Sequence, residues 1–195
     1  MTAARSTRSS RRMSRGHEGA DKKTRPFRRP TMPSAPARGH LLIPESVAQA
    51  TQLALRGFAG PDGRHEGIVF WAGRLDDGDQ LVATALIPRA THGTGYVCCS
   101  GSAFGAAVSL AVAHRLVLLS QVHSHPGNDT LHSTGDDQLI IMAHEGMYSI
   151  VIAQFGDGGV TPSSGAGIHQ FQDGRWVRVS DPEEAVIVVP ASLCQ

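Results

Sequence analysis

The chain has 195 residues, about one domain's worth, with enough length for a sizeable hydrophobic core. No apolar run approaches the roughly 18 residues that a membrane-spanning helix needs, and no secretory apolar segment follows the start, so we expect a cytoplasmic protein without a membrane partner. The three cysteines form no Cys-x-x-C pair, and an odd number argues against a disulfide framework.

Charge is distributed unevenly along the chain. Residues 1–38 contain 11 Lys and Arg against 2 acidic residues, whereas residues 39–195 contain 7 and 15. With almost nothing apolar to bury, residues 1–38 are predicted to form a basic disordered arm ahead of one folded domain over residues 39–195. The arm could bind nucleic acid through counterion release. A solvated tail, a transit peptide, or translation that starts at Met13 or Met32 would explain the same composition.

From residue 39 onward the apolar periodicity and the turn signals predict a mixture of strands and helices. In chain order we expect a helix over 44–58, strands over 67–72, 80–87 and 96–99, a helix over 102–114, a strand over 116–122, a helix over 137–145 that ends at Gly146, a strand over 148–155, and a closing hairpin of strands 168–172 and 176–179. This order predicts an α/β fold with a mixed central sheet flanked by helices.

A cluster of metal-ligand residue types follows the strand predicted at 116–122. His123 and His125 are two positions apart, so on an extended chain their side chains point to the same face. Pro126 ends the strand, and Asp136 lies in the first turn of the next predicted helix. Two imidazole nitrogens and one carboxylate oxygen would leave one position of a tetrahedral zinc ion open, which is typical of a catalytic site.

Other interpretations of these residues remain open. Ser133-Thr134-Gly135-Asp136 also fits a helix capping box, in which the serine and the aspartate serve only backbone N–H groups. A lone His-x-His on a strand is more often incidental than metal-binding. His132 is expected to be a surface residue rather than a fourth ligand. The joint occurrence of these groups at one strand-to-helix junction nevertheless favours a metal site.

His123-Ser124-His125-Pro126, followed after six residues by Ser133 and after two more by Asp136, resembles the full signature of the JAMM (JAB/MPN) metalloproteases. The resemblance covers approximately residues 41–180 and implies a JAB/MPN-like α/β sandwich. It also implies that His123, His125 and Asp136 hold Zn²⁺ and that the Ser133 hydroxyl helps to stabilise the oxyanion.

The family also uses an upstream glutamate on an early strand as its general base. Glu66, which precedes the short apolar stretch ending at Gly73, resembles that residue. Val69 departs from the pattern, because many members carry an additional glycine there. Glu45, at a predicted helix start, is the competing upstream glutamate.

The resemblance implies cleavage of amide or isopeptide bonds after the C-terminal tail of a ubiquitin-like or sulfur-carrier protein, which would be the partner. Precursor processing or deconjugation in a bacterial conjugation or defence system fits a short chain without a long insertion. The alternatives are a non-catalytic JAB-like binding module and a zinc hydrolase of another small amide substrate. A nucleobase deaminase is excluded, because its His-x-Glu and Pro-Cys-x-x-Cys ligands do not occur. The sequence does not indicate the oligomeric state.

Overall fold

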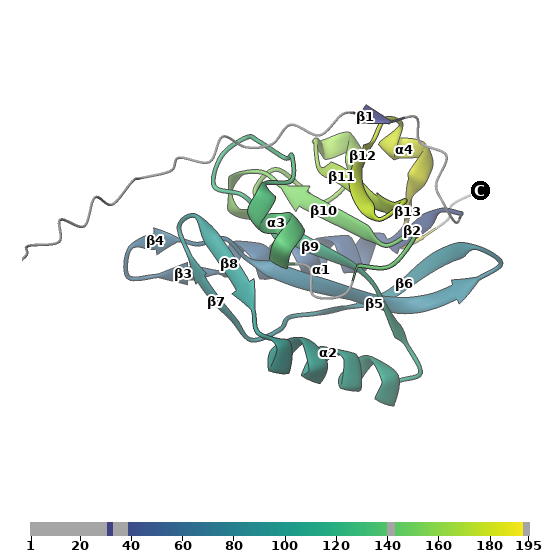
Figure 1. Cartoon of the computed structure of the whole chain (residues 1–195), viewed down its shortest axis with the longest axis horizontal. Coiled ribbons are helices and arrows are strands. Elements are labelled where there is room, and N and C mark those ends of the chain that lie inside the picture. The colour runs from purple at the N-terminus through teal and green to yellow at the C-terminus, as the bar shows by residue number, and fades with distance from the viewer. Residues whose placement is uncertain (1–30, 33–38, 140–142, 193–195) are drawn as a thin grey trace, which may run out of the picture.

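The computed structural model describes residues 31–32, 39–139 and 143–192, and its centre is a mixed sheet (Figure 1). Within the described residues the sheet has nine strands in the order β1-β12-β11-β10-β9-β5-β6-β2-β13. Their bounds are β1 (Thr31–Met32), β2 (Leu41–Pro44), β5 (Ile68–Asp76), β6 (Asp79–Leu86), β9 (Val117–Ser124), β10 (Tyr148–Ile152), β11 (Gly167–Gln172), β12 (Arg175–Val179) and β13 (Val186–Val189). The sheet contains parallel pairs such as β9–β10 and antiparallel pairs such as β5–β9, which confirms the predicted mixed sheet.

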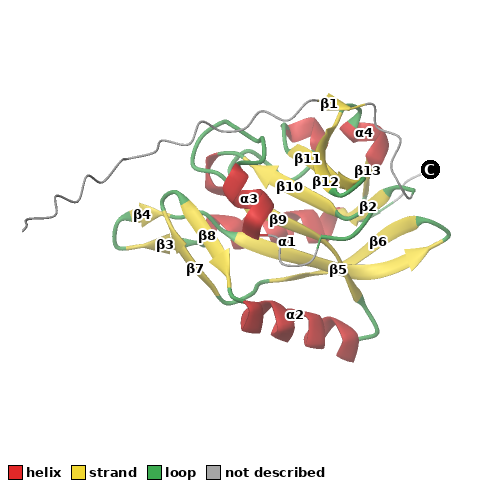
Figure 2. Cartoon of the chain, in the orientation of Figure 1, coloured by secondary structure: helices red, strands yellow, loops and turns green. Residues whose placement is uncertain are grey.

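The two long helices, α1 (Glu45–Arg56) and α2 (Gly101–Ala113), cover opposite faces of this sheet. On β5, Val69 and Trp71 belong to the core cluster that includes α1, whereas Ile68 and Phe70 pack in the cluster that includes Ala107 of α2. Alternate residues of a strand point to opposite faces, so β5 is covered on both sides. Figure 2 shows α2 below β5, while α1 lies behind β9. The predicted α/β class with helices flanking the sheet is confirmed.

Shorter elements complete the fold. Two antiparallel hairpins lie outside the main sheet, one formed by β3 (Ala59–Gly60) and β4 (Gly63–Arg64) and the other by β7 (Ala90–Gly93) and β8 (Tyr96–Cys99). The short helices are α3 (Thr134–Leu139), α4 (Pro182–Ala185), η1 (Gln154–Gly156) and η2 (Pro162–Ser164). The sequence analysis missed β2, β7 and β13, each only four residues long.

Two predicted elements have different bounds in the structure. The helix predicted over 137–145 begins earlier, at Thr134, and residues 143–145 are not helical, because Gly146 and Met147 exchange backbone hydrogen bonds with Phe171 on β11. The strand predicted over 148–155 ends at Ile152, since Gln154 and Phe155 adopt positive φ angles of 55° and 56°. In both places a tertiary contact overrides the local pattern.

The predicted basic arm lies mostly outside the described residues. Thr31 and Met32 are the exception, because they form β1 beside β12 rather than the disorder predicted for them. In the part of the chain that the structure describes, no helix is long and apolar enough to cross a membrane.

The candidate site follows from the connection between β9 and β10. Parallel neighbours need a crossover, because the chain must return to the same end of the sheet before it runs forward again. This crossover spans residues 125–147 and carries α3, so the residues that follow β9 are brought against the start of α3.

Candidate metal centre

The three predicted ligands meet at the end of β9. His123 lies on β9, His125 directly follows it, and Asp136 is in the first turn of α3. His123 Nε2 is 3.3 Å from His125 Nε2 and 3.4 Å from Asp136 Oδ1, and His125 Nε2 is 3.3 Å from Asp136 Oδ2. Among the described residues these three form the one group of His, Cys, Asp or Glu side chains that could hold a metal ion, the candidate metal-ligand group.

The spacing of these atoms can be compared with that of a zinc site. A tetrahedron whose centre lies ~2.0–2.1 Å from each ligand atom has edges of about 3.3–3.4 Å. The three measured separations have this length. The donor set of two imidazoles and a carboxylate is also one that zinc accepts. Residues and spacing therefore fit a tetrahedral metal ion.

Backbone and loop contacts hold His125 in place. Its N–H donates to Ile152 O at 2.8 Å, and its carbonyl accepts from Phe155 N at 2.8 Å, so the left-handed residues after β10 wrap around it. His125 Nδ1 lies 2.9 Å from Asp129 O. A carbonyl only accepts, so Nδ1 carries the proton and Nε2 offers its lone pair to the site.

Asp136 and Ser133 form the predicted capping box. Ser133 N donates to Asp136 Oδ2 at 2.6 Å, and Asp136 N donates to Ser133 Oγ at 3.1 Å. The same carboxylate faces both histidines, so capping and ligand geometry coexist. Burial raises the pKa of Asp136, but the charge and hydrogen bond of His123 and the hydrogen bond of His125 outweigh it and hold the pKa far below its ordinary range.

Glu66, two residues before the start of β5, is brought beside the metal-ligand group. Its N–H donates to Gly93 O of β7, and Gly67 N donates to Ser124 Oγ at 2.9 Å, while Ser124 N donates to Gly67 O at 3.0 Å. Ser124, between the two histidines, thus clamps the start of β5 to β9. Glu66 is 9% exposed. Burial raises its pKa, the charges of His125 and His123 lower it, and Asp136 raises it again, with the net shift upward.

A cleft of about 270 Å³ opens over these groups. Figure 1 shows α3 and β8 at this end of the sheet, and both contribute to the cleft. The lining residues are Glu66, Gly95, Tyr96, Val97, His125, Pro126, Ser133, Gly135 and Asp136. Every predicted catalytic or ligand residue except His123, which lies beneath at 3% exposure, therefore lines one cleft.

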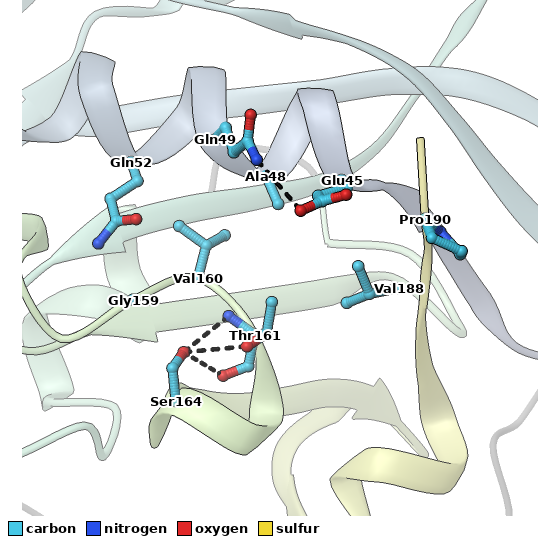
Figure 3. A pocket seen from close by; sticks show the side chains of 10 residues that line it. All are labelled: Glu45, Ala48, Gln49, Gln52, Gly159, Val160, Thr161, Ser164, Val188 and Pro190. Carbon is cyan, nitrogen blue, oxygen red and sulfur yellow. Dashed lines mark hydrogen bonds between the residues drawn. The ribbon is translucent and has the colours of Figure 1, made fainter. Parts of the chain in front are cut away.

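The competing glutamate, Glu45, lies elsewhere. It is at the start of α1 in a separate hollow of about 400 Å³ that shares no lining residue with the cleft, and its Oε1 accepts from Gln49 at 3.2 Å (Figure 3). Across this hollow, Ser164 is hydrogen-bonded to Thr161. The geometry therefore groups Glu66, and not Glu45, with the metal ligands.

The prediction that His132 is a surface residue is wrong. His132 is 1% exposed, with its ring between Asp137 and Ser149. Ser149 and His169, which stacks on it, come from β10 and β11, so no short-range pattern signals this burial. Only the proximity of His132 and Asp137 in sequence could have suggested a pair. The sequence analysis also missed the clamp formed by Ser124.

Comparison with known proteins agrees with this geometry. No family model matches the chain. A protein of Sinorhizobium fredii named "Probable metalloprotease" is 32% identical over 124 residues, which cover 58% of this chain and 70% of the relative. The chain belongs to the JAMM (JAB/MPN) metalloprotease family.

Solved structures are similar to this JAMM chain at lower identity. A solution structure of a protein from Desulfitobacterium hafniense aligns with a TM-score of 0.59 and 15% identity, over 77% of this chain and 93% of that one. A crystal structure of a JAB1/MPN domain protein from Archaeoglobus fulgidus aligns with a TM-score of 0.43 and 15% identity, over 77% and 98%. At this identity the likeness to the first of them supports the fold alone.

Val69 is the position at which this JAMM chain departs from many members. It is fully buried under α1 in the main core, where its side chain packs with the cluster that includes Trp71 and Val122. The register of β5 against β9 still pairs Ile68 with His123. The departure therefore leaves Glu66 beside the ligands.

Proposed function

We propose that this chain is a zinc-dependent peptidase or isopeptidase that cleaves after the C-terminal tail of a ubiquitin-like or sulfur-carrier protein. The observation that carries the proposal is the combination, in one cleft, of three ligand atoms at tetrahedral spacing, a buried glutamate of raised pKa and a serine hydroxyl. Membership in a metalloprotease family supports the same chemistry.

His123, His125 and Asp136 would hold the zinc ion. Among the described residues no fourth His, Cys, Asp or Glu joins this group, so one coordination position remains for water or substrate, as in catalytic zinc sites. A zinc ion bound there would polarise the scissile carbonyl and lower the pKa of a coordinated water toward ~7. Neutral imidazoles and an ionised carboxylate are the states that binding requires.

Glu66 would move the proton of the attacking water. The water oxygen bonds to the carbonyl carbon while Glu66 accepts one proton, and the C–N bond then breaks as Glu66 returns that proton to the leaving amine nitrogen. A raised pKa suits this exchange, because a general acid–base works best when its pKa lies nearer to the working pH.

Ser133 would stabilise the developing oxyanion. Its Oγ already accepts from Asp136 N, so the hydroxyl proton remains available as a donor toward the cleft. A positioned donor of this kind typically contributes on the order of 10²–10³ in rate.

The cleft suits an extended tail of small residues. Gly95 and Gly135 line it without side chains, and Tyr96, 56% exposed, adds an aromatic ring. A Gly-Gly tail would fit such a passage, whereas a bulky side chain beside the scissile bond would not. This supports precursor trimming or release of a modifier, in the bacterial conjugation or defence setting that the family resemblance suggests.

The test is a cleavage assay on fusions in which a ubiquitin-like protein ending in Gly-Gly precedes a reporter, combined with metal analysis of the purified protein. We expect wild type to contain or bind one zinc ion and to cleave after the tail. Glu66→Gln should lose on the order of 10²–10⁴ in rate. Glu45→Gln, the matched control in the separate hollow, should retain wild-type activity.

Different results would identify different errors. Equal turnover by wild type and Glu66→Gln would contradict the mechanism. Zinc binding without cleavage of any fusion, together with hydrolysis of small amides, would favour a hydrolase of another substrate. Zinc binding with no hydrolysis at all would favour a non-catalytic binding module.

A further inference from the structure

His132 lies at the centre of a buried polar network behind the metal-ligand group. Its side chain is fully buried, its Nε2 lies 2.8 Å from Ser149 Oγ, and its Nδ1 lies 3.1 Å from Asp137 Oδ1. Gln121 Nε2 donates to the same Ser149 oxygen at 3.2 Å. A buried polar side chain is costly unless its partners are in place, so this arrangement is specific.

The direction of each hydrogen bond follows from the donors present. The Gln121 amide donates to Ser149 Oγ, so the Ser149 hydroxyl proton can donate to His132 Nε2. His132 Nδ1–H then donates to the Asp137 carboxylate, which only accepts. One neutral tautomer of His132 therefore satisfies the whole chain of bonds.

Main-chain and ring contacts fix His132 further. Its backbone N–H donates to His169 Nε2 at 3.4 Å, and the two imidazoles stack with centroids 4.1 Å apart and planes 26° apart. The His132 ring also lies 5.8 Å, centroid to centroid, from that of the predicted ligand His123. Residues of β10 and β11 thus hold the chain immediately before Ser133.

The position of Asp136 depends on this support. His132 directly precedes Ser133, and Asp137 directly follows Asp136. The His132–Asp137 hydrogen bond therefore joins the two residues that flank the capping box. α3 is described over Thr134–Leu139, and residues 143–145 are not helical, so it is shorter than the about 12–15 residues that a helix needs to be stable without tertiary contacts. Gln121 and His123 are two positions apart on β9 and face the same side. The network therefore links the strand that carries one ligand with the helix that carries another.

We propose that His132 is a positioning residue that holds Asp136 in ligand geometry before any metal arrives, acting through Asp137 and Ser149. This inference rests on the proposed function, since it assumes that Asp136 binds the metal. Outer partners that orient metal ligands typically contribute 10- to 100-fold to metal affinity.

The experiment measures Co²⁺ binding by the full chain, because the visible absorption of Co²⁺ is more intense in a four-coordinate than in a six-coordinate site. His132→Phe keeps a ring of similar volume and removes both side-chain hydrogen bonds. Asp137→Asn keeps an acceptor for Nδ1–H without the charge, whereas Asp137→Leu removes both. The difference between the two Asp137 variants isolates the hydrogen bond from the charge, and Asp137, at 22% side-chain exposure, tolerates exchange better than His132.

We expect His132→Phe and Asp137→Leu to bind Co²⁺ 10- to 100-fold more weakly than wild type, with a weaker absorption band, and Asp137→Asn to stay within about threefold. In the metal-free protein, amide hydrogen exchange over residues 132–137 should be faster in the first two variants only. If His132→Phe does not fold, the Asp137 pair alone decides the outcome.

Unchanged Co²⁺ affinity and spectrum in folded His132→Phe, or equal affinities of Asp137→Leu and Asp137→Asn, would overturn the positioning role. A wild-type protein that binds no Co²⁺ would overturn both this inference and the proposed function. Wild-type binding that depends on His132, in a protein that cleaves no modifier fusion, would contradict the proposed substrate and leave the positioning role standing.

Discussion

Two carboxylates whose pKa values are shifted in opposite directions line the cleft. Asp136 accepts a hydrogen bond from Ser133 and faces two imidazoles, so its pKa is lowered despite burial. Among the described residues none donates a hydrogen bond to the Glu66 carboxylate, and burial dominates, so its pKa is raised. Carboxylates whose pKa values are pushed apart in this way suit different roles, one as a permanent anion and one as a proton carrier.

At this residue scale, Glu66→Gln should stabilise the metal-free protein at neutral pH. The folded-state pKa of Glu66 lies above its ordinary value of 4.5. At a pH between these two pKa values, the native state binds more protons than the unfolded state, so the stability of the native state falls as the pH rises. Glutamine removes this cost. The gain in stability is complete above the raised pKa of Glu66 and disappears as the pH falls below 4.5.

Urea unfolding of both proteins at pH 7 and at pH 4.5 measures the effect. Glu45→Gln, which exchanges a glutamate in the first turn of α1, should change stability by no more than about 0.5 kcal/mol and serves as the control. A Glu66→Gln protein that is less stable than wild type at pH 7 would show that the glutamate is stabilised by partners rather than strained by burial.

At the scale of elements, the loop that leads to α3 is supported by the first residue of β11. A Cβ added to Gly167 would overlap the backbone carbonyl oxygen of Thr130, and a backbone atom cannot swing aside as a side-chain tip can. The glycine is therefore required by close approach of two backbones, and the position of the loop depends on β11.

Gly167→Ala should displace this loop and lower the stability by roughly 1–3 kcal/mol, as overpacking of a buried site does. Zinc binding should weaken on the order of tenfold. Gly105→Ala is the matched control, because a Cβ at this exposed α2 position meets nothing within 4 Å and should stabilise the helix by about 0.4–1 kcal/mol. Thermal unfolding and zinc titration of the two variants measure these effects. If Gly167→Ala binds zinc as tightly as wild type, the loop adjusts without moving the proposed ligands.

At the scale of the whole molecule, metal binding and folding are linked. The proposed ligands come from the end of β9 and the start of α3, so they converge only in the folded chain, and zinc should raise the melting temperature. Burial lowers the pKa of His125, but Asp136 outweighs it and leaves the pKa above its ordinary value of 6.5. Protons therefore begin to compete with zinc at a pH above 6.5.

We expect the zinc-induced rise in melting temperature to be largest near pH 8 and to shrink as pH falls through 6.5, and removal of zinc by a chelator to reverse it. Asp136→Asn keeps the capping acceptor but loses the anionic ligand, so its melting temperature should hardly respond to zinc. A rise in wild type that does not depend on pH would contradict the role of the imidazoles.

The sequence by itself determined the candidate ligand set, because His123, His125 and Asp136 lie at one strand-to-helix junction whose geometry follows from local backbone periodicity. It also predicted strands and helices in mixed order, and hence the α/β class, since these elements depend on apolar patterns within single segments. Only the tertiary structure decided that Glu66 rather than Glu45 joins the ligands, through the pairing of β5 with β9, and that His132 is buried. These outcomes depend on which strands become neighbours. The free energy gained by contacts between segments far apart in the chain cannot be predicted from the sequence of either segment alone.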